Sequence, residues 1–178
     1  MDFKKFFKKK RARDYLIFGL TIALGIFIDQ FTKWLAVAYL APVVDVPIIN
    51  GVIHLHFHLN PGAAFGMLAD HPYIFNTLSV VIILAMSFYL FAGHTTGMLQ
   101  SVACAMIISG GIGNMIDRVL FGEVTDFIYF KLIDFAIFNG ADSFVCVGAG
   151  LLALSLILDI IKEEKEKRNK GQNDNSCG

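Results

Sequence analysis

The run Tyr15–Trp34 reads YLIFGLTIALGIFIDQFTKW, a continuous apolar stretch whose only charged side chains are Asp29 and Lys33. A helix needs about 20 mostly apolar residues to cross the hydrocarbon layer of a bilayer, which is roughly 30 Å thick. This run is longer than the apolar part of a typical cleaved secretory signal, and it lacks a clear small-x-small cleavage site. It therefore predicts a permanent transmembrane helix at about residues 15–35.

Three further apolar segments of spanning length follow, at about residues 73–92, 98–118 and 142–161. The second and third of the four segments are separated only by Gly93–Gly97, which predicts a tight antiparallel hairpin. With 56% hydrophobic residues, the chain is too apolar for an ordinary soluble domain. We expect an all-α integral membrane protein with four transmembrane helices.

The positions of the basic residues predict the orientation of these helices. Of the 15 Lys and Arg residues, all but Lys33, Arg118 and Lys131 lie before the first span or after the last. Short segments rich in Lys and Arg stay in the cytoplasm, so both termini are expected there and both long connections outside. Nucleic-acid binding is the competing interpretation, but these bases directly flank membrane-length runs. We therefore expect these basic residues to contact membrane lipids and not nucleic acid.

The stretch Ile53–Leu59 alternates apolar and polar residues, as a strand with one apolar face does. It predicts a small extracytoplasmic β-containing segment between the first two helices, resting at the membrane surface. The polar positions are His54, His56 and His58, whose spacing also suits a zinc site and hence a zinc hydrolase. A wet strand face opposite a lipid-facing one is the simpler interpretation, so no metal is expected.

Polar residues inside the spans gather near the predicted outer ends. They are Asp29, Lys33, Asn114, Asp117, Arg118 and Asp142. Ionisable groups in a membrane span are costly and indicate function. The cytoplasmic halves of the spans are expected to be essentially free of such groups, which disfavours an ion transporter. Asp29 and Lys33 are one helical turn apart, and a structural ion pair and direct substrate contact remain equally open.

Glycines on the third span, Gly110, Gly111 and Gly113, predict that neighbouring helices approach it closely. Five motifs then occur in order along the chain: Asp29-Gln30-x-x-Lys33, Asn60-x-Gly62-Ala63-Ala64-Phe65, Gly110-Gly111-x-Gly113-Asn114-x-x-Asp117-Arg118, Val124-x-Asp126-Phe127 and Phe138-Asn139-x-Ala141-Asp142-Ser143. This pattern resembles lipoprotein signal peptidase, also called signal peptidase II. Gly140 departs from it, because family members usually carry an apolar residue there.

The resemblance implies an intramembrane aspartic endopeptidase that removes signal peptides from diacylglyceryl-modified prolipoproteins, cutting before the lipidated cysteine. No metal or other cofactor is implied, and a monomer in the bacterial inner membrane is expected. The resemblance assigns catalysis to Asp126 and Asp142. The residues it assigns to substrate binding or site support are Asp29, Lys33, Asn60, Gly62, Asn114, Asp117, Arg118, Asn139 and Ala141.

On this basis we expect a peptidase domain at 15–161, a basic cytoplasmic segment at 1–14 and a charged, disordered cytoplasmic tail at 162–178. Two carboxylates that share a proton can activate water and protonate the leaving group, so the pair suits peptide hydrolysis. Asp142 alone is equally well explained by the preference of acids for helix N-termini. Asp134, which lies outside the motifs, is expected to be a solvated loop residue. The rival functions are a small transporter or channel subunit and a membrane scaffold.

Overall fold

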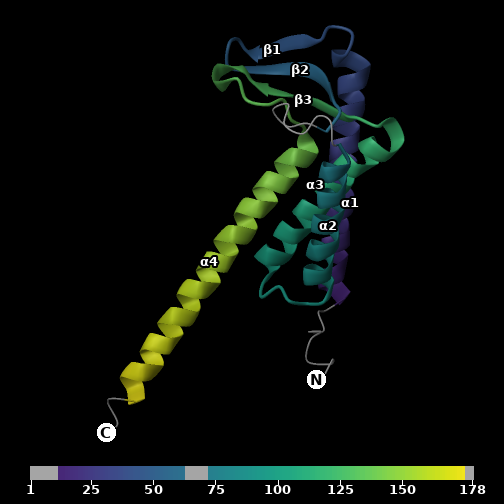
Figure 1. Cartoon of the computed structure of the whole chain (residues 1–178). Coiled ribbons are helices and arrows are strands. Elements are labelled where there is room, and N and C mark those ends of the chain that lie inside the picture. Colours follow the sequence, from purple (N-terminus) through teal and green to yellow (C-terminus); the bar gives the residue numbers. More distant parts are fainter. Residues whose placement is uncertain (1–11, 63–71, 175–178) are drawn as a thin grey trace.

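The computed structural model describes residues 12–62 and 72–174, and within them four helices carry a small sheet at one end (Figure 1). The helices are α1 (Ala12–Leu35), α2 (Pro72–Phe91), α3 (Met98–Phe121) and α4 (Gly140–Asp174). Helices α1, α3 and α4 are long and apolar enough to cross a membrane, and α2 contains a shorter apolar stretch, Asn76–Phe91. The expected all-α membrane architecture is confirmed.

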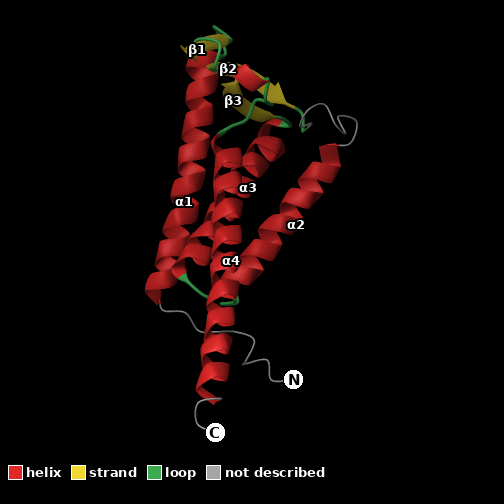
Figure 2. Cartoon of the chain, turned by 90° about the vertical axis from the view of Figure 1, so that its left-hand side faces the viewer, coloured by secondary structure: helices red, strands yellow, loops and turns green. Residues whose placement is uncertain are grey.

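Helix α3 is the centre of the bundle, because it packs against each of the other three helices (Figure 2). Its glycines let the neighbours approach. A Cβ at Gly110 would collide with the backbone oxygen of Ala141 on α4, and one at Gly111 would lie 2.7 Å from Ile83 on α2. The close approach predicted from the glycine run is therefore confirmed.

The sheet has the order β1 (Asp45–Ile49), β2 (Ile53–Asn60) and β3 (Val124–Phe130), with both pairs antiparallel. Strand β2 is the one predicted from alternation. Strand β3 was not predicted, since it comes from the connection between α3 and α4 and its first three residues are all buried. The sheet thus joins the two long connections, and it brings Asp126 of β3 opposite His58 of β2.

Helix α4 continues through residues 162–174, so the prediction of a disordered tail is wrong for that segment. Glu163 and Lys167, and likewise Glu164 and Arg168, are spaced i to i+4, with the acid first, and such pairs stabilise an exposed helix. Residues 1–11 and 175–178 lie outside the described part of the chain. The start of α1 and the end of α4 lie at the end of the bundle opposite the sheet (Figure 1).

Candidate active site

A cavity of about 970 Å³ lies where the sheet meets the adjoining ends of α3 and α4. Asp126, at the start of β3, and Asp142, in the first turn of α4, both line it. Their positions depend on the sheet, because pairing of β3 with β2 folds the connection back over the start of α4. The two predicted catalytic residues therefore share one cavity.

Asp126 is almost completely buried, with 1% of its surface exposed. Its Oδ2 accepts a hydrogen bond from Asn60 Nδ2 at 2.9 Å, and its Oδ1 accepts one from Asn139 Nδ2 at 2.7 Å. Burial raises the pKa of Asp126 to about 7, and the nearby charge of Asp142 acts in the same direction. The two amide donors oppose this rise in the pKa without cancelling it. Near neutral pH, Asp126 can therefore hold or release a proton.

Asp142 is fixed by the way α4 begins. Its backbone N–H donates to Asn139 Oδ1 at 3.0 Å, while its Oδ2 accepts from the Asn139 backbone N–H at 3.2 Å. This reciprocal pair is a capping box in which Asn139 is the N-cap and Asp142 occupies the third helical position. Asn114 Nδ2 donates to the other carboxylate oxygen at 2.7 Å. The carboxylate is thus oriented on both sides.

Beside the two aspartates lies a buried ionic network centred on Lys33. The ammonium is 2.9 Å from Asp29 Oδ2 and 3.1 Å from Asp117 Oδ2, and it donates to Asn114 Oδ1 at 2.9 Å. Of these four residues, Asn114 extends the network to Asp142. Lys33 is absent from the residues that line the cavity. The geometry therefore favours the structural ion pair over direct substrate contact.

Asp29 and Asp117 also hold backbone groups in place. Asp29 Oδ1 accepts from the N–H of Ala141 at 2.8 Å, so a carboxylate of α1 caps the first turn of α4. Asp117 Oδ2 accepts from the N–H of Thr125 at 3.1 Å and so fixes the start of β3. Gln30, quoted in the first motif but not proposed as a site residue, donates to Asp117 Oδ1 at 2.9 Å.

The second motif places Asn60 and Gly62 at the cavity wall. The N–H of Gly62 donates to Asn60 Oδ1 at 2.9 Å, which turns the Nδ2 group toward Asp126. Gly62 has φ 108°, a backbone conformation that favours glycine. The remaining motif residues, Ala63, Ala64 and Phe65, lie outside the described residues.

Arg118 also lines the cavity, from the last turn of α3. Its Nε–H is buried and has no hydrogen-bond partner among the described residues. A buried donor without a partner is unfavourable, so an acceptor supplied by a bound peptide would satisfy it. This makes Arg118 a candidate contact for a substrate carbonyl.

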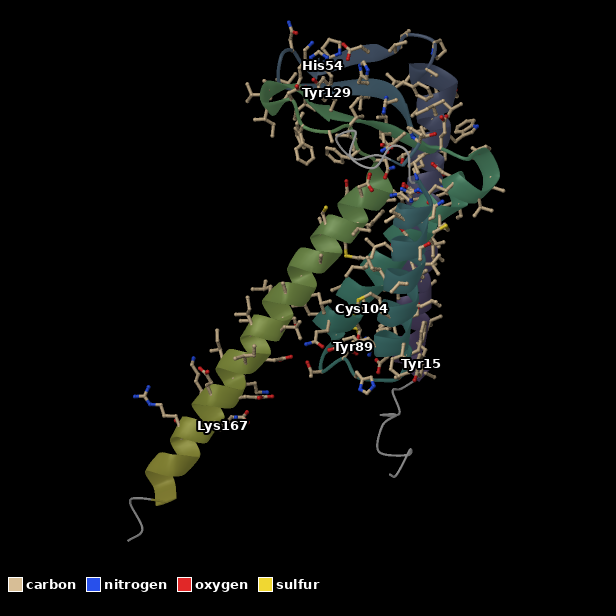
Figure 3. All side chains as sticks on the ribbon, in the orientation of Figure 1. Tyr15, His54, Tyr89, Cys104, Tyr129 and Lys167 are labelled. Carbon is tan, nitrogen blue, oxygen red and sulfur yellow. The ribbon has the colours of Figure 1, made fainter. Side chains whose placement is uncertain are left out.

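The strand histidines are arranged around a carboxylate and not as a zinc site. His54 Nδ1 and His56 Nδ1 lie 2.9 and 3.1 Å from the carboxylate of Asp45 on β1. A register irregularity between Leu55 and His58 interrupts the strand pairing at this point. Figure 3 shows His54 and Tyr129 together in the sheet. Within residues 12–62 and 72–174, no cluster of three or more His, Cys, Asp or Glu is arranged to hold a metal.

At the other end of the bundle lies a polar cluster that the sequence did not predict. Asp159 Oδ2 of α4 accepts from Gln100 Nε2 at 2.8 Å and also bonds with Thr96, which ties α4 to the turn between α2 and α3. The expectation that this half of the spans is essentially free of ionisable groups is therefore wrong for α4. The labels of Tyr89 and Cys104 in Figure 3 mark this half of the bundle.

Comparison with known proteins adds independent support. The sequence matches the family described as signal peptidase (SPase) II over residues 21–158. It is 39% identical over 154 residues to the lipoprotein signal peptidase of Halalkalibacterium halodurans, covering 85% of this chain and 99% of that protein. It is 37% identical over 155 residues to the lipoprotein signal peptidase of Bacillus subtilis, covering 85% of this chain and 100% of that protein.

The fold is also similar to a solved structure of a bacterial membrane enzyme, with a TM-score of 0.71 and 30% sequence identity. That similarity covers 81% of this chain and 89% of the other. Family match, sequence identity and fold similarity each cover most of the chain. The chain therefore belongs to the signal peptidase II family of aspartic peptidases, the lipoprotein signal peptidases.

Proposed function

We propose that this chain removes the signal peptide from prolipoproteins whose cysteine carries a diacylglyceryl group, cutting the bond just before that cysteine. Removal of prolipoprotein signal peptides is the activity of the family to which the chain belongs. The single observation that carries the proposal for this chain is the pair Asp126 and Asp142, which face one cavity and are both bonded to Asn139.

The pair can supply both proton transfers that peptide hydrolysis needs. One carboxylate takes a proton from water as the water oxygen attacks the scissile carbonyl carbon. The other, protonated, polarises that carbonyl, and a proton reaches the leaving nitrogen as the carbon–nitrogen bond breaks. The raised pKa of Asp126, to about 7, suits it to hold the shared proton, although the titration belongs to the pair. Arg118 Nε–H would donate to a substrate carbonyl and so align the scissile bond.

We also propose an orientation, with the sheet and cavity at the extracytoplasmic face and both termini in the cytoplasm. The bases before α1 and after residue 161 support it. Reporter fusions after Gly51 and after Lys170 test it. The expected result is an extracytoplasmic signal from the first and a cytoplasmic signal from the second. Signals from the same side would contradict the proposed topology.

The activity is tested with purified protein and two forms of one prolipoprotein, with and without the diacylglyceryl group on the cysteine. The lipidated form should be cut before the cysteine, as measured by a gel shift and by mass spectrometry of the new N-terminus. The non-lipidated form should stay intact. Equal cleavage of both forms would contradict the lipid requirement, and no cleavage of either would contradict the proposed activity.

A further inference from the structure

The cavity is lined by both apolar and polar side chains. Cys146 and Val147 of α4 make one side apolar. Phe130, Phe135 and Phe138 add apolar surface beside the sheet, since the backbone N–H groups of Phe135 and Phe138 donate to β3. The sheet and the connection after it also contribute the polar residues His56, His58, Tyr129 and Asp134, which we call the polar rim. The proposed cleavage mechanism uses none of these four side chains.

Asp134 is held toward the cavity by two features. It follows the 3₁₀ turn Lys131–Ile133 with φ 48°, a left-handed conformation that Asp tolerates better than most residues. The hydroxyl of Tyr129 donates to its Oδ1 at 2.6 Å. That bond also raises the pKa of Tyr129, so the phenol stays protonated and continues to donate. The carboxylate makes no other hydrogen bond among the described residues, and it is exposed.

The rim carries the negative charge of Asp134, which forms no ion pair among the described residues. Of the described residues that line the cavity, only Arg118 is a Lys or Arg, and it comes from α3. The ring of His56 is already engaged with Asp45, at 3.1 Å. Asp45 therefore adds a second carboxylate to this side of the sheet. Asp134 is the acid of the rim that a ligand can reach.

Tyr129 of the rim lies at a fixed spacing from Asp126 along β3. Tyr129 is three residues beyond Asp126 on β3, which corresponds to about 10 Å of strand. An extended substrate covers that distance with about three residues. The apolar signal peptide is matched by the apolar side chains of α4 at the cavity, Cys146 and Val147. The polar rim, at the sheet end, then faces the part of the substrate that follows the lipidated cysteine.

We propose that Asp134, oriented by Tyr129, forms a subsite for the side chains about two to four positions after the lipidated cysteine, and that this subsite favours basic residues over acidic ones. The inference rests on the proposed function. It adds a selectivity among prolipoproteins that the two aspartates alone do not provide. The effect is modest, because both partners are exposed to water and to salt.

The test compares three lipidated peptides that differ only in having Lys, Ser or Asp at the second and third positions after the cysteine. With unaltered protein at low ionic strength, kcat/KM should be about two- to fivefold higher for the Lys peptide than for the Asp peptide. Asp134→Asn should bring this ratio close to one, and Tyr129→Phe should lower it partly. Glu163→Gln, which removes an exposed carboxylate far along α4, is the matched control and should leave the ratio unchanged.

A ratio that is the same in Asp134→Asn as in the unaltered protein would overturn the subsite. Equal cleavage of all three peptides by the unaltered protein would overturn it too, and would leave the proposed function intact. Failure to cut any of the three would instead contradict the proposed function. Because each protein is judged by a ratio of two substrates, a variant that is partly unfolded still gives a valid answer.

Discussion

Asn139 and Asp126 are joined by a hydrogen bond of 2.7 Å from the side-chain amide of the first to Oδ1 of the second. The same asparagine caps α4 through its reciprocal bonds with Asp142. One residue therefore positions both aspartates: the first directly, and the second through the start of a helix. This double role can be separated by substitution.

Asn139→Ser should keep the helix cap and lose the contact with Asp126, since serine is a good N-cap residue but has no amide donor. We expect turnover to fall roughly 10- to 100-fold, because a hydrogen bond to a charged group contributes about 1.5–3 kcal/mol. Asn139→Ala should lose about 1 kcal/mol more of unfolding free energy, since the cap is then absent too. Steady-state kinetics and thermal unfolding measure the two effects. Asn50→Ala, in an exposed turn, is the control, and normal turnover by Asn139→Ser would contradict the bridging role.

Gly110→Ala tests whether the close contact between α3 and α4 positions Asp142. The added Cβ would collide with the backbone oxygen of Ala141, which precedes Asp142 directly, and would lie 2.8 Å from Val145. Overpacking of this kind costs about 1–3 kcal/mol, and turnover should fall as the start of α4 shifts. Gly150→Ala on α4 is the control, because no atom lies within 4 Å of its added Cβ. Thermal unfolding and turnover of both variants, measured in the same detergent, test this prediction. Equal stability and equal turnover of the two variants would contradict it.

Lys33→Met should destabilise the protein strongly, because Asp29 and Asp117 would keep buried charge without its cation. Breaking a buried ion pair in this way costs about 3–5 kcal/mol. Lys131→Met removes an exposed lysine and should change the unfolding free energy little. Asp29→Asn should likewise impair stability or substrate affinity. If Asp29→Asn abolished turnover in protein that folds and binds substrate normally, Asp29 would belong to the catalytic set.

Asp126 should make stability depend on pH in a known direction. Its pKa is about 7 in the folded protein, above its ordinary value of 3.8. Its contribution to stability is therefore fully present below about pH 3.8 and is lost as the pH rises through about 7, at up to about 1.4 kcal/mol per pH unit. Asp126→Asn removes this loss, so the variant should gain stability relative to the unaltered protein between about pH 5 and pH 8. Thermal unfolding at both pH values measures the gain, and a difference that does not change with pH would contradict the raised pKa.

Some elements of the fold were predictable because they depend on local sequence alone. Long apolar runs give the spans, and strict alternation gives β2. Strand β3 escaped prediction because VTDFIYF places Thr125 and Asp126 next to each other, and both are buried. The helical extension of α4 was not predicted because a charged, polar segment is typical of disorder, although the i to i+4 spacing of these charges favours a helix.

In the candidate site, too, local motifs were predictable and contacts between distant elements were not. The motifs identified the two aspartates, but not the bonds that hold them, because Asn139 and Asp126 lie on different elements that only the folded sheet brings together. Asp159 illustrates the opposite case. Its partner Gln100 is 59 residues away, and nothing in the local sequence of either residue indicates the pair.

The central claim is that Asp126 and Asp142 act as one catalytic unit. The most direct measurement is turnover of lipidated prolipoprotein by Asp126→Asn, Asp142→Asn and the double variant, each shown to fold and to bind substrate, with Glu163→Gln as the control. Each single substitution should remove nearly all cleavage, by about 1,000-fold or more, and the double variant should be little worse because the residues act together. A chelator should change nothing. Near-normal cleavage by either single variant would rule out the pair, and loss of cleavage on adding chelator would instead point to a metal held by His54, His56 and His58.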